Sequence, residues 1–188
     1  CGLGSGDEPA DVAENRRRAA EAVMPGASLV SVYQVHSPTC VTVTEPWGDD
    51  VRPEADALVT ARRGLLLAIV TADCAPVLLA DRKAGVVGAA HAGWKGALAG
   101  VTDRTIEAME SQGARRAEIV AAIGPCIGQA SYEVDEQFAQ RFHAEDAGNA
   151  RFFAPGRAGH LHFDLESYVA HRLESQGIGQ VEKLAGAL

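Results

Sequence analysis

The chain has 188 residues, of which 47% are hydrophobic and 22% are charged, and its formal net charge is −8. This length and composition exclude a disordered chain and fit one globular domain over residues 1–188, or at most two small ones. The acidic balance argues against a broad nucleic-acid surface, and the apolar runs are too short for a membrane span. With no signal-peptide pattern at the start, we expect a cytoplasmic protein that acts on small molecules.

The first predicted element is a helix at residues 11–23, where apolar residues recur at near-helical spacing. Two β-branched runs follow at 29–37 and 40–44, and a Ser-Pro-Thr break between them resembles a turn. His36 stands at that corner.

The middle of the chain is strongly apolar. We expect a short strand at 56–60 and two strands within 64–81 that meet around Asp73 to Pro76, because a residue before proline is disfavoured in a helix. The later elements are a strand from 86, a helix at 97–113, a strand entering the Gly-Pro-Cys loop at 124–126, helices at 135–143 and 163–177, and a strand at 178–184. This irregular alternation predicts an α/β (α+β) fold of mixed sheets flanked by helices, rather than a regular βαβ array.

Four cysteines lie far apart without a C-x-x-C pair, so no disulfide framework or zinc knuckle is indicated. However, His36, Cys74 and His91 each follow a predicted strand, where the chain turns. Two imidazoles and a thiolate suit zinc, and three protein ligands leave a fourth position for water or substrate. Two alternatives stay open on these residues alone: hydrogen-bonded strand ends with a buried thiol, or Cys74 as a nucleophile with His91 as its base.

The segment HAGWKG at 91–96 places Gly93 and Lys95 just before a predicted helix. Backbone amides at such a bend, with a lysine nearby, attract phosphate, although a plain glycine-rich turn accounts for the pattern equally well. Asp73 is either a substrate-binding residue or a turn residue that bonds nearby amides. Glu133 is more simply interpreted as an acid at a helix start than as a ligand contact.

Five blocks, QVHS, DALVT, TADCAPVLLAD, GVVGAAHAGWKG and IGPCIGQASYEV, occur in this order. Together they resemble a bacterial family first described as multicopper polyphenol oxidases or laccases. The family is now described as zinc-dependent purine nucleoside phosphorylases with adenosine deaminase activity, and also as peptidoglycan editing factors. The resemblance implies layered mixed sheets similar to those of toxin-type cysteine hydrolases.

The same resemblance implies that His36, Cys74 and His91 hold zinc and form the catalytic centre, with Lys95, Gly93 and Asp73 at the substrate. The implied reactions are cleavage of adenosine, inosine, guanosine or methylthioadenosine by phosphate, and deamination of adenosine. The implied partners are a nucleoside and phosphate, with no nucleic acid or membrane, in a monomer or homodimer.

Two departures from the family pattern are visible. The Thr-Arg-x-Gly-Gly segment and the arginine-rich tail are not found here, so we expect a chain that lacks terminal family segments. Gln129-Ala130-Ser131 stands where paired cysteines are usual. The rival functions are a Cys-His hydrolase of peptidoglycan precursors, a copper-dependent polyphenol oxidase and a noncatalytic nucleotide-binding module. Six histidines in total are few for a multicopper site, which makes copper the weaker alternative.

Overall fold

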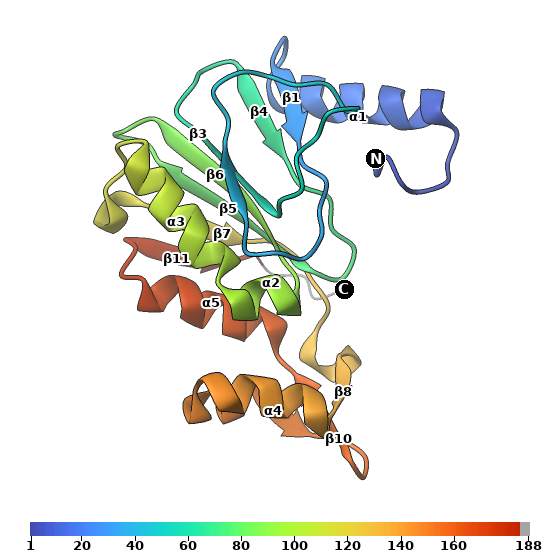
Figure 1. The fold of residues 1–188 in the computed structure, drawn as a ribbon, viewed down its shortest axis with the longest axis vertical. Helices are drawn as coiled ribbons and strands as arrows, with labels where there is room; N and C mark the ends of the chain where they lie inside the picture. Colours follow the sequence, from blue (N-terminus) through green and yellow to red (C-terminus); the bar gives the residue numbers. More distant parts are fainter. Residues whose placement is uncertain (185–188) are drawn as a thin grey trace.

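A computed structural model of the protein describes residues 1–184. They form a six-stranded sheet, a two-stranded sheet and a three-stranded sheet, with helices packed around them (Figure 1). The mixed-sheet α/β fold predicted from the sequence is confirmed. In the part of the chain that the structure describes, no helix is long and apolar enough to cross a membrane.

The six-stranded sheet carries the main core. Its strand order is β11 (Gln180–Lys183), β7 (Val120–Ile123), β5 (Ala75–Asp81), β6 (Val86–Ala92), β3 (Ala57–Thr60) and β2 (Cys40–Thr42). Strand β6 lies antiparallel between β5 and β3, whereas the outer pairs β11–β7 and β2–β3 are parallel. Both neighbours of β6 therefore begin near the end of β6, and this arrangement positions the candidate site.

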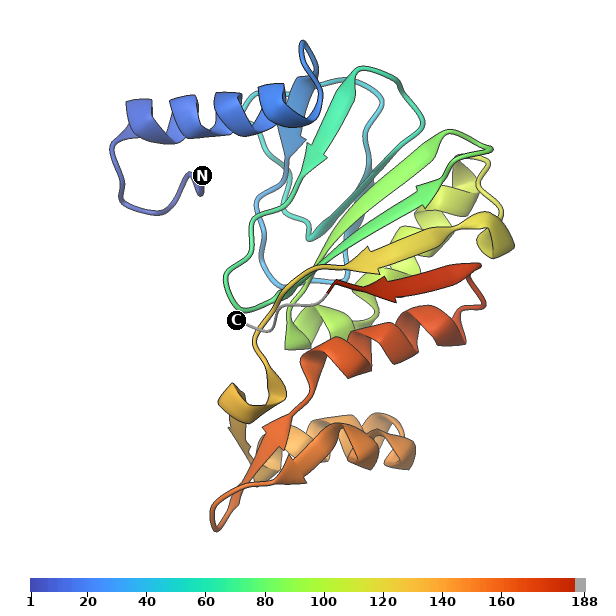
Figure 2. The same ribbon diagram turned by 180° about the vertical axis from the view of Figure 1, so that it is seen from behind.

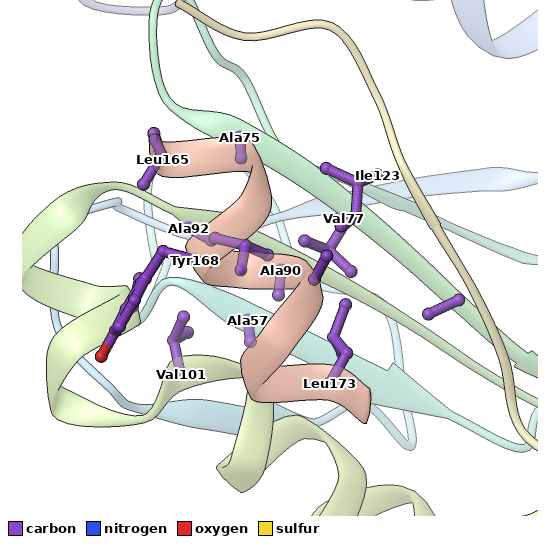
Figure 3. Packing of buried hydrophobic residues seen from close by; sticks show 14 of the residues in the cluster. Ala57, Ala75, Val77, Ala90, Ala92, Val101, Ile123, Leu165, Tyr168 and Leu173 are labelled. Carbon is purple, nitrogen blue, oxygen red and sulfur yellow. The ribbon is translucent and has the colours of Figure 1, made fainter. Parts of the chain in front are cut away.

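Helices α2 (Trp94–Ala99), α3 (Val101–Ser111) and α5 (Leu165–Ser175) cover one face of this sheet (Figures 1 and 2). Successive side chains of a strand point to opposite faces of the sheet. Along β5 every second residue is buried, and these residues face the helices. Figure 3 shows Leu165, Tyr168 and Leu173 of α5 packed over the small residues of the central strands. Burial of this apolar surface is the main source of the stability of the domain.

Helix α1 (Pro9–Val23) lies beside the parallel pair β1 (Ser28–Ser31) and β4 (Leu65–Ala68), away from the three covering helices (Figure 2). This pair builds a second, smaller core, in which Val30 and Leu65 pack with Leu58 of β3. The helix at 11–23 was predicted from the apolar spacing of the sequence, and the strands at 40–44, 56–60 and within 64–81 from β-branched and apolar runs.

The third sheet joins β8 (Glu133–Asp135), β10 (His160–Phe163) and β9 (Phe153–Pro155) and packs with α4 (Glu136–Glu145) at one end of the molecule (Figure 1). These three strands were not predicted from the sequence, because segments of three or four residues are too short to show a period. An aromatic cluster fixes them to the main core; its members are Phe138, Phe142, Phe153, Phe163 and Tyr168.

Two predicted elements differ in the structure. The helix expected at 97–113 is split by Gly100, whose φ of 93° ends α2 and starts α3. A Cβ there would also lie 2.7 Å from Oδ2 of Asp103. Glycine therefore suits this position both by its backbone conformation and by its lack of a side chain. The strand expected at 29–37 ends at Ser31. Tyr33 forms an isolated parallel bridge with Glu54, and the amides of residues 35–37 bond to a buried carboxylate instead of to a neighbouring strand.

Candidate metal centre

Strand register brings the site together around His91 in β6. Ala57 of β3 pairs with Ala90, and Pro76 of β5 pairs with His91 itself. The residues just before these strands, Asp56 and Cys74, therefore lie on opposite sides of His91. The prediction that each candidate ligand follows a strand is wrong for His91, which lies within β6, whereas Cys74 lies as expected in the bend between β4 and β5.

The third residue, His36, reaches the site from the loop between β1 and β2. Its Nε2 lies 3.7 Å from Sγ of Cys74, and its ring meets the ring of His91 edge-on with centroids 4.8 Å apart. One ligand atom from each of the three residues can be chosen so that all lie within 4.8 Å of one another. Two imidazole nitrogens and a sulfur at this spacing fit a tetrahedral cation such as zinc, with one position left over.

The three candidate ligands differ in their exposure to solvent. His91 is buried, Cys74 is half-buried and His36 is exposed. Gly93 lies against two residues of the cluster. A Cβ at this position would lie 2.7 Å from Cδ2 of His36 and 2.8 Å from Sγ of Cys74. The backbone is thus bare beside two of the three donors, which fits a site with room for an ion next to His36 and Cys74.

Asp56 forms hydrogen bonds with both histidines. Its side chain is fully buried, and its oxygens accept hydrogen bonds from the amides of Val35, His36 and Ser37, from the Ser37 hydroxyl and from Nδ1 of His91. Because a carboxylate only accepts, Nδ1 of His91 carries a proton, and Nε2 becomes available to a cation when it releases its own proton.

These contacts set the ionisation of the pair. Burial alone raises the pKa of Asp56, but the hydrogen bonds from His91, Ser37 and His36 outweigh it and lower the pKa to about 2. Burial alone lowers the pKa of His91, but Asp56 and Cys74 outweigh it and raise the pKa to about 9. The carboxylate therefore stays charged at neutral pH and favours any positive charge at the ring.

Comparison with known proteins identifies the family of the chain. A family model for multi-copper polyphenol oxidoreductase laccases matches residues 1–186. The chain belongs to this family. The family name describes copper chemistry, whereas the only cluster of three or more metal-binding side chains found within residues 1–184 is His36, Cys74 and His91.

Named relatives of this laccase-family chain point to another activity. It is 45% identical over 178 residues to a purine nucleoside phosphorylase of Deinococcus radiodurans, covering 93% of this chain and 67% of that protein. It is 50% identical over 145 residues to purine nucleoside phosphorylase ORF3 of Streptomyces griseus, covering 76% of this chain and 57% of that protein. The chain therefore spans between about half and two thirds of the length of these relatives.

A solved structure has the same fold. The Neisseria meningitidis protein NMB0706 aligns with a TM-score of 0.89 and 32% sequence identity, over 99% of this chain and 74% of that one. The layered mixed sheets are thus shared along the whole described length of this laccase-family chain.

The three residues predicted at the substrate lie in different settings. Gly93 borders the cluster of candidate ligands. Lys95 is exposed in the first turn of α2, with Nζ 5.6 Å from the centroid of the Trp94 ring. Asp73 is exposed in the bend before β5, and its backbone carbonyl accepts a hydrogen bond from the amide of Ile127 at 3.0 Å.

Glu133 does not start a helix, contrary to the interpretation from the sequence. It lies in β8 and pairs with Arg157 at 2.9 Å, whereas the cap of α4 is Asp135, which accepts from the amide of Phe138 at 2.7 Å. Tyr132, next to it, is half-buried; burial, with the charges of Cys74 and Asp73, raises its pKa to about 12.

Asp56 was not among the site residues predicted from the sequence, although it begins the block DALVT. One signal was available: an acid directly before four fully buried strand residues needs donors that compensate its burial. Which donors it finds depends on the register of β3 against β6 and on the path of the loop at 35–37, and local periodicity carries neither.

Proposed function

We propose that this chain carries the metal centre of a zinc-dependent purine nucleoside phosphorylase. The observation that carries the proposal is the convergence of His36, Cys74 and His91 in a chain whose relatives are named purine nucleoside phosphorylases. In the proposed reaction, phosphate replaces the purine at C1′ of adenosine, inosine, guanosine or methylthioadenosine. The products are the free base and the sugar 1-phosphate.

Zinc is proposed rather than copper on the chemistry of the donor set. Two imidazoles and one thiolate around a single position are typical of a zinc site that keeps one coordination position open. Multicopper oxidation needs several copper ions with many histidine ligands, and the described part of the chain gathers one cluster with two histidines.

Each residue of the site would have its own role in binding the ion or the phosphate. His36, Cys74 and His91 would hold the ion, and Asp56 would keep the His91 proton on Nδ1. A zinc ion bound there would supply Lewis-acid chemistry, stabilising negative charge that develops on a reacting oxygen. Lys95 would offset the charge of phosphate, and the Gly93 backbone would allow the anion to approach closely.

Adenosine deamination is proposed as a second activity of the same site. In this reaction the oxygen of water replaces the 6-amino group of adenine, and ammonia leaves. The proposal is supported by the resemblance of the sequence blocks to a family described with both activities. Asp73, the exposed neighbour of Cys74 in the chain, is the substrate-binding residue proposed for this reaction.

A Cys-His hydrolase is kept as a second candidate because of one observation. His91 contacts Cys74 on one side and Asp56 on the other. This is the arrangement of a nucleophile, a base and a residue that orients the base. In that case Cys74 would attack a carbonyl carbon of a peptidoglycan precursor and expel its amine as the C–N bond breaks, with the proton supplied by His91. Water would then hydrolyse the thioester, and no metal would be needed.

The test begins with elemental analysis of the purified chain, for which we expect about one zinc per molecule. Adenosine and inosine are then incubated with and without phosphate, and the products are separated by chromatography. Adenine or hypoxanthine formed only with phosphate supports phosphorolysis, and inosine formed from adenosine supports deamination.

Matched variants decide between metal ligand and nucleophile. Cys74→Ala is expected to lose both zinc and turnover, whereas Cys1→Ala, which changes an exposed thiol outside the cluster, is expected to keep both. A Cys74→Ala protein that retains zinc, or a wild-type activity that survives a strong chelator but not iodoacetamide, would favour the hydrolase instead.

A further inference from the structure

We infer that Asp56 is a positioning residue that holds both histidine ligands in the geometry required to capture the cation. The inference rests on the metal site of the proposed function, but not on the identity of the reaction. Asp56 does not reach the proposed substrate; it acts through His36 and His91.

One oxygen atom joins the two ligands. Oδ1 of Asp56 accepts from the backbone amide of His36 at 2.9 Å and lies 2.8 Å from Nδ1 of His91. A second link comes from the main chain, because the amide of His91 donates to the carbonyl of Asp56 at 2.7 Å. The two histidines are 55 positions apart in the chain and come from a loop and a strand, so this residue is the shared support that sets their separation.

The other oxygen fixes the loop. Oδ2 accepts from the amides of Val35 and Ser37, at 3.2 and 2.6 Å, and from the Ser37 hydroxyl at 2.9 Å. Three successive amides thus turn toward one anion, in the manner of the backbone nests that bind phosphate in other proteins. Here the anion belongs to the protein itself.

His36 shows what this anchoring achieves. Its φ is 61°, in the left-handed region, and it is the sole non-glycine residue among residues 1–184 with a positive φ. Such a conformation costs free energy and persists only where surrounding contacts impose it. The bonds from residues 35–37 to Asp56 are those contacts, and the resulting turn directs Nε2 of His36 toward Sγ of Cys74.

A purely structural role for Asp56 makes a different prediction, and the chain offers a matched residue for comparison. Asp81, at the far end of β5, is also buried, and its carboxylate also accepts from three backbone amides, those of Lys83, Ala84 and Arg115. Both carboxylates hold loops, but only Asp56 contacts candidate ligands.

The test compares Asp56→Asn with Asp81→Asn in the same chain. Zinc affinity is measured by competition with a chromophoric chelator, and cobalt(II) is bound in place of zinc so that its visible absorption spectrum reports ligand geometry. We expect Asp56→Asn to bind zinc about 10- to 100-fold more weakly and to change the cobalt spectrum. Asp81→Asn should lower the unfolding temperature but keep the wild-type affinity and spectrum.

The outcomes separate this inference from the proposed function. Wild-type affinity and spectrum in a folded Asp56→Asn protein would overturn the positioning role while leaving the metal centre intact. A wild-type chain that binds neither zinc nor cobalt would overturn both, whereas metal binding without phosphorolysis would overturn only the proposed reaction.

A milder variant covers the case in which Asp56→Asn does not fold. Ser37→Ala keeps the carboxylate and removes one donor to Oδ2, and we expect zinc affinity to fall by about two- to tenfold. Unchanged affinity together with an unchanged cobalt spectrum in this variant would then overturn the inference.

Discussion

Gly93 faces Cys74 so closely that a Cβ added to the glycine would lie 2.8 Å from the thiol sulfur. The same added atom would lie 2.7 Å from Cδ2 of His36, so one substitution would disturb two of the three candidate ligands. The backbone of Gly93 has φ −73° and ψ 163°, which any residue adopts, so its requirement for glycine is steric rather than conformational.

We therefore predict that Gly93→Ala loses zinc affinity by at least about tenfold, because the new methyl displaces ligands that must be held within about 0.5 Å. The measurement is zinc content after dialysis, together with competition against a chromophoric chelator. Gly4→Ala is the control, since nothing lies within 4 Å of a Cβ there. Equal zinc content in the two variants would contradict the prediction.

The four thiols should differ in their reactivity. Burial raises the pKa of Cys40 to about 12 and, with help from nearby carboxylates, that of Cys126 to about 11. A raised pKa lowers the thiolate fraction, to about one part in a thousand or less at pH 8. Iodoacetamide at pH 8 should therefore label exposed Cys1 first, and Cys40 and Cys126 far more slowly, with rates that rise as the pH is increased.

Cys74 provides the internal comparison in the same experiment. We expect its labelling to be blocked by zinc and restored by a chelator, while labelling of Cys1 stays the same in both conditions. Peptide mass spectrometry assigns each modified residue. Labelling of Cys126 as fast as that of Cys1 would mean that the loop at 124–128, in which Cys126 is buried, opens readily.

Removal of the metal should destabilise the folded chain. A ligand that binds only the native state stabilises it by about 2.7 kcal/mol when its free concentration is 100 times its dissociation constant. We expect zinc to raise the unfolding temperature of the wild-type chain, and the increase to disappear in Cys74→Ala. A similar increase in both proteins would place zinc binding elsewhere.

The aromatic cluster should be the main support of the small third sheet. Phe142 is fully buried, with its ring centroid 4.7 Å from that of Phe163 and 5.0 Å from that of Tyr168. Truncation in Phe142→Ala should lower the free energy of unfolding by about 3–5 kcal/mol through lost burial and a residual cavity. The midpoint of denaturant unfolding measures this loss. The control Val23→Ala, at a site 72% exposed, should change stability by less than about 0.5 kcal/mol.

The sequence predicted the regular elements where a long enough period exists. The apolar passage at 64–81, interrupted between Asp73 and Pro76, indicated two strands, and the apolar spacing at 11–23 indicated a helix; both are confirmed. The chemistry of the donors also singled out His36, Cys74 and His91 before their positions in space were known, although their spacing is equally compatible with a buried thiol and hydrogen-bonded histidines at strand ends.

Other features were decided only by tertiary structure. The short strands β8 to β10, for example, depend on pairing with one another. The role of Asp56 depends on β3 lying antiparallel to β6 in the register that sets Ala57 opposite Ala90. Local periodicity determines which face of a strand is buried, because that depends on neighbouring residues. It does not determine which distant donor meets a buried carboxylate, because that contact exists only after the strands have paired.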